Sequence, residues 1–398
     1  MGLEEQLCLL LARRSSDEAE QKTRQLLAAP LAWDRFLEVV RAQEILPLVY
    51  CNLKRLEFAG VPQDVQQELA KLFRANALRN TLLAEELLRV LALLAEAHVQ
   101  AIPLKGIPLA ESLYHDSALR VCADIDILVP PLQFVAAFQI LRAAGYESGF
   151  SQLHLAKLIA RFGKDCGLMR QNGAHWYPLQ LHAGLLWGGP MEKAIAEEIW
   201  SEAQPTTFHN APGFSFSPEW QFLYLAIHAA RHGLSPWKFL VDIDRLCGDA
   251  TISWEAVREK AVRLGWEAPV DSVLAACSDL FGTTIPAALI REASNRESSL
   301  PATLAETDHS GLRILREMRF SIGLLRSPWK KLQYAATRIF IPTPADTRSL
   351  SLPGSLFFLY YAWRPLRLAF TVAGWLVEAA RQDRRSRSTN PDGAIQAN

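Results

Sequence analysis

The sequence predicts an α+β fold that is mostly helical, with a small mixed sheet flanked by N-terminal and C-terminal helical regions. Apolar residues recur at helical spacing over residues 1–99 and again over 190–345. Between these stretches, from Ala101 to about Trp187, short runs of strand-forming residues alternate with helical patterns. Half of the 398 residues are hydrophobic and 21% are charged, which is typical of a globular chain long enough for two or more domains.

The N-terminal helical region is expected to cover residues 1–99. Residues from Asp17 to Ala29 and from Trp33 to Ala42 place apolar side chains at helical spacing. No Pro or Gly interrupts the chain between Pro62 and His98, so we expect one long helix that Pro62 opens.

Residues 100–190 are expected to form the sheet. Asn172-Gly173 predicts a turn between two of its strands. The expected elements are a short strand from Ala101 to Gly106, a strand over Ile125–Val129, a helix from Pro131 to Ala144, and strands over Tyr146–Phe150, Cys166–Arg170 and Pro178–His182.

The rest of the chain divides into a helical domain (191–345), a C-terminal apolar helical segment (346–380) and a disordered tail (381–398). The tail is rich in Arg and Ser and then in Asn, Pro and Gly, which is typical of disorder. Residues 302–308 are polar and predict a loop. Helices are expected over Glu192–Ser201, Pro218–His232, Trp237–Cys247, Trp254–Leu264 and Pro269–Phe281.

Two aspartates in the run Ala123-Asp-Ile-Asp-Ile-Leu-Val129 carry most of the functional information. Residues i and i+2 of a strand point to the same side, so Asp124 and Asp126 share one face while Ile125 and Ile127 enter the core. A carboxylate pair at this spacing suits Mg²⁺ or Mn²⁺, which prefer hard oxygen ligands. The alternative interpretation is a solvated strand edge or a turn.

A glycine and two cations precede this pair. Gly106 ends the first strand, and a glycine lets the backbone approach a phosphate closely. Lys105 and Arg120 supply positive charges that a triphosphate needs.

Together, Leu104-Lys-Gly, Tyr114 and Arg120-x3-Asp124-Ile-Asp126 resemble the nucleotidyltransferase superfamily that includes DNA polymerase β. More narrowly, the chain resembles a bacterial family of uncharacterised nucleotidyltransferases. Further stretches that fit this family are Leu179-Gln-Leu-His182, His228-Ala-Ala-Arg-His232 followed by Trp237 and Leu240-Val-Asp-Ile-Asp244, and Pro342-Thr-Pro-x-Asp346.

The resemblance implies a nucleotidyltransferase core in residues 100–190 and metal-dependent transfer of a nucleoside monophosphate from an NTP to a hydroxyl group. The acceptor could be a small molecule, a sugar, an RNA end or a protein side chain. The resemblance also implies that Asp124 and Asp126 bind Mg²⁺ or Mn²⁺. Lys105, Gly106 and Arg120 would bind the nucleotide.

Two departures from the superfamily pattern bear on activity. Gly106 is followed by Ile107, where the superfamily usually has a second Gly or a Ser that contacts phosphate. Gln180 occupies the position where the family tends to carry a third carboxylate, and a glutamine has no charge and cannot act as a base. The alternative is therefore a catalytically degenerate nucleotide-binding or scaffold protein with the same fold.

Three histidines are accessory candidates. His182 ends the strand that carries Gln180, and His228 and His232 lie at i, i+4 on one helix face. That spacing can bind zinc, but no third ligand is evident. The alternatives are structural histidines or residues beside the nucleotide.

The composition limits partners and location. Lys plus Arg and Asp plus Glu number 42 each, so general nucleic-acid binding is not expected. Six scattered cysteines without a Cys-x-x-Cys pair indicate reduced thiols in a cytoplasmic protein. The apolar and then Arg-rich stretch 356–387 predicts either peripheral membrane contact or a helical hairpin packed on the protein.

Overall fold

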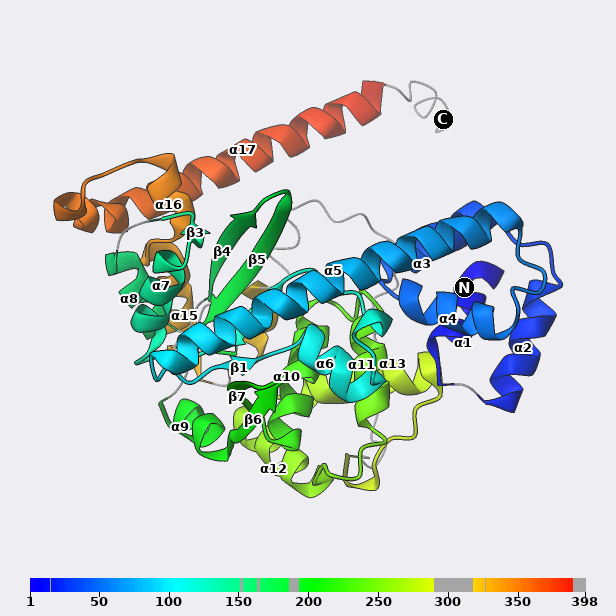
Figure 1. Cartoon of the computed structure of the whole chain (residues 1–398). Helices are drawn as coiled ribbons and strands as arrows, with labels where there is room; N and C mark the ends of the chain where they lie inside the picture. The colour runs from blue at the N-terminus through cyan, green and yellow to red at the C-terminus, as the bar shows by residue number, and fades with distance from the viewer. Residues whose placement is uncertain are drawn as a thin grey trace.

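The computed structural model describes residues 1–14, 16–150, 153–162, 165–185, 193–289, 318–325 and 327–388. It confirms a mostly helical α+β fold with a small mixed sheet among helices (Figure 1). The chain begins with four short helices, α1 (Leu3–Ala12), α2 (Asp17–Leu27), α3 (Trp33–Ala42) and α4 (Leu46–Arg55). The 34-residue helix α5 (Gln63–Glu96) then runs from these helices past the sheet (Figure 1).

The sheet has the strand order β1-β2-β5-β4-β3. Strands β2 and β5 are parallel, and the other neighbours are antiparallel. Its strands are β1 (Ile102–Pro103), β2 (Ile125–Leu128), β3 (Glu147–Ser148), β4 (Asp165–Asn172) and β5 (His175–His182). The intervening helices are α6 (Ile107–Tyr114), η1 (Ser117–Leu119), α7 (Phe134–Ala143) and α8 (Leu153–Arg161).

A second, two-stranded sheet interrupts the helices that follow. It joins β6 (Gln204–Phe208) to β7 (Ala211–Ser215), and the sequence pattern did not predict it. Pro205, Pro212 and Gly213 obscure the strand signal, whereas His209 and Asn210 adopt the positive φ that a two-residue hairpin turn needs. The neighbouring helices are α9 (Lys193–Glu202), α10 (Pro218–Arg231), α11 (Lys238–Leu246), α12 (Trp254–Leu264), α13 (Glu267–Phe281) and η2 (Ala287–Leu289).

The C-terminal part consists of α15 (Pro328–Phe340), α16 (Pro344–Ser349), η3 (Gly354–Leu359) and α17 (Tyr360–Ser388). Helix α17 ends at Ser388, eight residues inside the segment from 381 that the sequence analysis expected to be disordered. Arginine favours helices, and no Pro or Gly occurs between residue 381 and Pro391. The loop expected at 302–308 lies outside the described residues.

Two hydrophobic clusters hold the fold together. One joins α1–α4 and the start of α5 to α10–α13, and it includes the buried Phe36, Trp220 and Trp237. The other joins the second half of α5 to the sheet, α7 and α8, and it includes Ile127 and Leu179. Phe357 and Tyr360 of the C-terminal part also belong to this second cluster. No helix in the described part of the chain is long and apolar enough to cross a membrane.

Candidate active site

Asp124 and Asp126 lie at the start of β2 and share one cation. The Lys105 Nζ lies 3.4 Å from Asp124 Oδ1 and 2.5 Å from Asp126 Oδ2. The neighbours Ile125 and Ile127 are buried in the hydrophobic cluster of the sheet. The alternation along β2 thus sends both carboxylates toward one point while the isoleucines anchor the strand.

The electrostatics of this group favour its charged forms. Burial opposes ionisation of Asp126, but the Lys105 charge and a hydrogen bond with His182 outweigh it and hold the pKa of Asp126 well below its ordinary value. Burial likewise opposes protonation of Lys105, but the charges of Asp126 and Asp124 raise the pKa of Lys105. Asp126 and Lys105 are therefore a buried, charged pair, and the Asp124 side chain beside them is 29% exposed.

Gly106 lies beside this cluster in a conformation that suits glycine. Its φ of 78° and ψ of −126° are strained for any residue with a Cβ. A Cβ there would lie 3.5 Å from the Asp124 carbonyl oxygen, so the backbone of Gly106 passes close to Asp124. The same residue precedes the first turn of α6, whose free N–H groups face the start of the helix.

Gln180 and His182 come from β5, next to the aspartates. Asp126 pairs in register with Gln180, so both side chains leave the same face of the sheet. His182 Nε2 lies 3.0 Å from Asp126 Oδ1. Asp165 on β4 pairs with His182 and Gly167 pairs with Gln180, which places Asp165 on this face as well. Gln180, His182 and Asp165 thus share one face of the sheet with the aspartates, and of these three His182 contacts Asp126.

The structure places Arg120 away from this corner, in a buried ion pair. Its Nε lies 3.1 Å from both carboxylate oxygens of Asp242 on α11, and its Nη2 lies 2.9 Å from Oδ2. The Tyr114 hydroxyl donates to Asp242 as well, at 2.7 Å. Arg120 and Tyr114 therefore join the core to α11, although the sequence grouped Arg120 with the nucleotide-binding residues.

Helix α10 packs beside the cluster with His228, which the sequence analysis proposed, and with Tyr224, which it did not single out. Burial and the Asp126 charge raise the pKa of Tyr224, and burial and the Lys105 charge lower the pKa of His228. The rings of His228 and His232 lie 4.6 Å apart, and both contact Phe239. Tyr224 is four residues before His228 on the same helix face, which is the signal that could have found it.

The donor atoms fit a cation that a nucleotide helps to bind. Among the described residues, no three His, Cys, Asp or Glu side chains come together as a ready metal site. Mg²⁺ commonly takes one or two carboxylates and completes its shell with water and phosphate oxygens. Asp124 and Asp126, which already converge on one ammonium, supply the two carboxylates.

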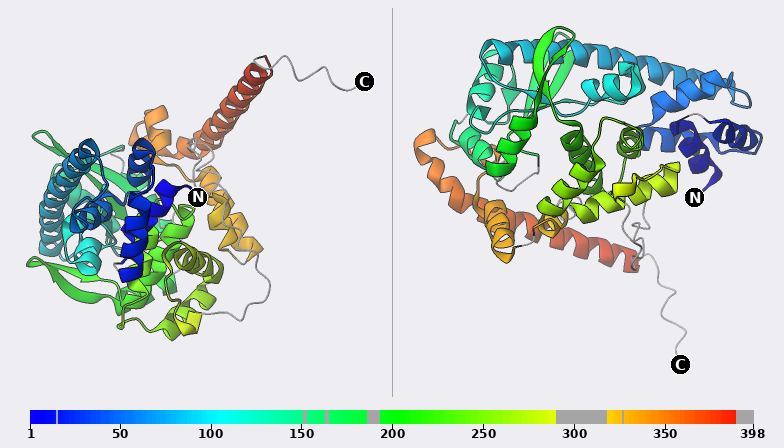
Figure 2. Two further views of the ribbon diagram at one scale, coloured as in Figure 1. Left: turned by 90° about the vertical axis from the view of Figure 1, so that its right-hand side faces the viewer. Right: turned by 90° about the horizontal axis from the view of Figure 1, so that it is seen from below.

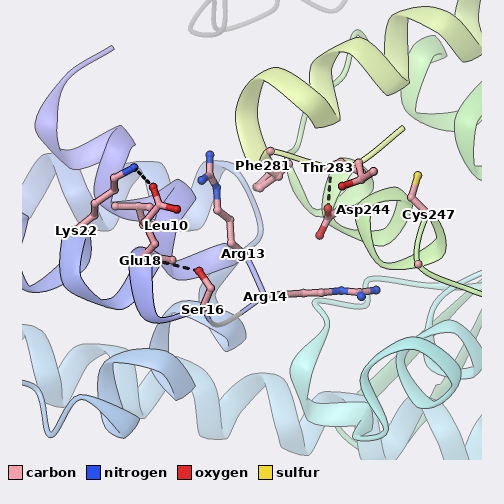
Figure 3. Close-up of a pocket in the computed structure, with 14 residues that line it drawn as sticks. Leu10, Arg13, Arg14, Ser16, Glu18, Lys22, Asp244, Cys247, Phe281 and Thr283 are labelled. Carbon is pink, nitrogen blue, oxygen red and sulfur yellow. Dashed lines mark hydrogen bonds and ion pairs between the residues drawn. The ribbon is translucent and has the colours of Figure 1, made fainter. Parts of the chain in front are cut away.

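A separate cavity of about 440 Å³ lies between the N-terminal helices and α11 and α13 (Figure 3). Arg13, Arg14 and the Glu18–Lys22 pair line one side, and Asp244, which accepts a hydrogen bond from Thr283, lines the other. Asp244 and Asp242 are two residues apart on α11 and so point to nearly opposite sides of the helix. The cavity therefore lies on the other side of α11 from the Arg120–Asp242 pair.

Comparison with known proteins gives one similarity. The sequence model of a family described as "uncharacterised nucleotidyltransferase" matches residues 29–282. Searches of curated proteins and of solved structures gave no match. The matched range includes all of the candidate residues, from Lys105 to His232.

Proposed function

Since this chain belongs to the family of uncharacterised nucleotidyltransferases, we propose that it transfers a nucleoside monophosphate from an NTP to a hydroxyl acceptor in a metal-dependent reaction. The observation that carries the proposal is the convergence of Asp124 and Asp126 on the Lys105 ammonium. A pair of carboxylates that binds one cation in the free protein is suited to bind another when substrate enters.

Each residue has a role that follows from its place. Asp124 and Asp126 would hold Mg²⁺ or Mn²⁺, and this cation would neutralise the negative charge that develops on the phosphate oxygens. Lys105, which pairs with both carboxylates in the free protein, would bind phosphate oxygens of the nucleotide through its ammonium. Gly106 lets the backbone at the start of α6 approach the triphosphate.

His182 positions Asp126 through the contact of 3.0 Å between Nε2 and Oδ1. Tyr224 and His228 on α10 exclude water from the same corner, because both are buried. The acceptor hydroxyl oxygen attacks the α-phosphorus, the bond from this phosphorus to the bridging oxygen breaks, and pyrophosphate leaves with the hydroxyl proton. The acceptor is a small molecule, a sugar, an RNA end or a protein side chain.

The test is incubation with each labelled NTP and Mg²⁺ or Mn²⁺, scored by pyrophosphate release and by labelling of the protein or an added acceptor. We expect Asp126→Asn to abolish metal-dependent NTP binding in calorimetry, because it removes charge from the carboxylate pair. The matched control is Asp279→Asn, which changes an exposed carboxylate on α13. Equal NTP affinity in the parent and in Asp126→Asn would contradict the metal role.

A second candidate is nucleotide binding without turnover. It is favoured by Gln180, which pairs in register with Asp126 where a third carboxylate would add charge. Saturable, metal-dependent NTP binding with no pyrophosphate release from any NTP or acceptor would favour this function over transfer.

A further inference from the structure

Helices α15 and α17 form a small helical unit beyond residue 282, where the family match ends. Its interior is polar. The Arg364 guanidinium donates to the Arg338 carbonyl oxygen at 2.7 and 3.1 Å and to Asp346 Oδ2 at 2.9 Å. Arg367 Nε lies 2.5 Å from Asp346 Oδ1. These bonds fix α15, α16 and α17 against one another, with Tyr334, Thr337 and Tyr360 also buried.

The outward sides of the same helices are apolar. Trp329 on α15 is 71% exposed and Phe370 on α17 is 70% exposed. Of the 19 large hydrophobic side chains that are exposed in the described part of the chain, 11 lie between residues 328 and 372. Single exposed apolar residues are ordinary, but this concentration in one segment marks an interaction surface.

On α15 the exposed apolar residues lie on the side opposite the buried Tyr334, Thr337 and Arg338. On α17 Leu366 lies opposite the buried Tyr360 and Arg364, and Phe370 and Val372 lie on its two flanks. The exposed apolar positions are Trp329, Leu332, Ile339 and Phe340 on α15, and Leu366, Phe370 and Val372 on α17, preceded by Phe358 and Leu359 on η3. Helix α15 therefore turns its apolar side outward, and α17 exposes apolar side chains around much of its circumference.

The positive charge of residues 328–388 favours a negatively charged partner. Residues 328–388 contain ten Lys and Arg against three Asp and Glu, a net charge of +7 in a chain whose total is zero. The rest of the chain therefore carries −7. Within the segment Arg338 and Arg364 are buried, whereas Lys330, Lys331 and Arg348 are exposed and can face a negative surface. Basic residues beside exposed Trp, Phe and Leu on a helix are typical of helices that lie in the interface of an anionic bilayer.

We propose that α15 and α17 form a docking surface for an anionic lipid membrane. Helix α17 lies at the periphery and projects from the rest of the molecule (Figures 1 and 2), so its outer side can approach a flat surface. This inference is independent of the proposed chemistry, because the surface lies outside the family match.

The test is cosedimentation of the full chain with vesicles of phosphatidylcholine alone or mixed with phosphatidylglycerol. We expect binding to the mixed vesicles that high salt weakens, and little binding to phosphatidylcholine alone. Phe370→Glu should reduce the bound fraction roughly tenfold or more, since it removes a buried ring from the interface and adds a negative charge. The matched control is Leu132→Glu, which changes a 99% exposed leucine far from these helices in sequence and should bind as the parent does.

Circular dichroism melting shows whether each variant is folded, and Leu366→Glu provides an independent second variant on α17. Failure of the parent to bind mixed vesicles would overturn the proposal. So would binding that Phe370→Glu and Leu366→Glu leave unchanged. Light scattering that shows a dimer which these two variants dissociate, without vesicle binding by the parent, would assign the surface to a second copy of the chain instead.

Discussion

Gln180 is the residue whose chemistry most limits the candidate site. It pairs in register with Asp126, and a Cβ on the neighbouring Gly167 would lie 3.5 Å from its amide nitrogen. The amide oxygen can ligate a cation but adds no charge. The negative charge of the cluster therefore depends on Asp124 and Asp126, which Lys105 partly neutralises.

We predict that Gln180→Glu raises the affinity for Mg²⁺ or Mn²⁺, because it adds a carboxylate beside the pair. Calorimetry with NTP and metal measures the effect, and pyrophosphate release shows whether turnover rises with it. Gln171→Glu, which adds the same charge at an exposed position of β4, is the control. A parent that turns over rapidly and loses rate on Gln180→Glu would show that Gln180 does not stand in for an acid.

At the residue scale, the sequence predicted what depends on local geometry. The i, i+2 rule is enough to bring Asp124 and Asp126 to one side of β2, with Lys105 nearby because β1 pairs with β2. This local rule could not predict the position of the Arg120 side chain, because Arg120 pairs with Asp242, which lies 122 residues away on α11. Whether a basic side chain near a motif binds a ligand or forms an internal ion pair depends on such long-range packing.

At the scale of elements, the Arg120–Asp242 pair joins the core to α11. Both side chains are almost fully buried, so neither charge is hydrated if its partner is lost. Burial opposes the charged form of Arg120, but the Asp242 charge outweighs it and raises the pKa of Arg120.

We predict that Arg120→Met lowers the free energy of unfolding by about 3–5 kcal/mol, because it leaves a buried carboxylate without a partner. The double variant Arg120→Met/Asp242→Leu should lose less than the sum of the two single changes. Denaturant unfolding of all four proteins measures the coupling. Arg35→Met, in an exposed pair with Glu5, should change the free energy of unfolding far less than Arg120→Met.

A second buried carboxylate ties α5 to the far strands of the sheet. Glu86 accepts hydrogen bonds from Arg89 at 2.7 Å, from Arg170 Nε at 2.8 Å and from the Tyr146 hydroxyl. Burial alone would raise the pKa of Glu86, but hydrogen bonds from Arg170, Arg89 and Tyr146 outweigh it and lower the pKa to about 2.

This pKa predicts an acid-sensitive contribution to stability. Glu86 has a lower pKa in the folded chain than the value of about 4.3 expected when unfolded. Its contribution is therefore complete above about pH 4.3 and is lost as the pH falls toward 2. We expect the parent to lose more free energy of unfolding than Glu86→Gln over this interval, with the exposed Glu85→Gln behaving as the parent. Urea unfolding at a series of pH values measures the difference, and parallel curves would contradict it.

At the scale of the whole molecule, all six cysteines are free thiols. Cys8, Cys122, Cys166 and Cys277 are buried, and burial raises the pKa of the half-buried Cys247 to about 12. We predict that a thiol reagent modifies at most Cys51 and Cys247 readily in the native protein and all six after unfolding. We also expect reductant to leave the melting temperature unchanged. Rapid modification of four or more thiols in the folded protein would contradict the burial of Cys8, Cys122, Cys166 and Cys277.

The overall architecture was predictable because long apolar patterns define helices. Trp33–Ala42 and Trp254–Leu264 have the expected ends, and the helix expected over Pro62–His98 spans Gln63–Glu96. The β6–β7 hairpin was not predicted, since its prolines and glycine carry no strand signal. Periodicity also could not show that the N-terminal helical region (1–99) and the helical domain (191–345) share one hydrophobic cluster. That depends on which helices meet in space.

The two halves of helix α5 find their packing partners at different times during synthesis of the chain. Its first half, with Val65 and Leu69, packs in a cluster that includes helices already made, whereas Leu83, Leu87 and Leu94 pack on the sheet. The central strand β5 ends only at His182, long after α5 has left the ribosome. At about 5–20 residues per second the apolar side of this half-helix stays uncovered for several seconds. The nascent chain therefore presents a ready site for a chaperone that shields apolar helices, until β5 is complete.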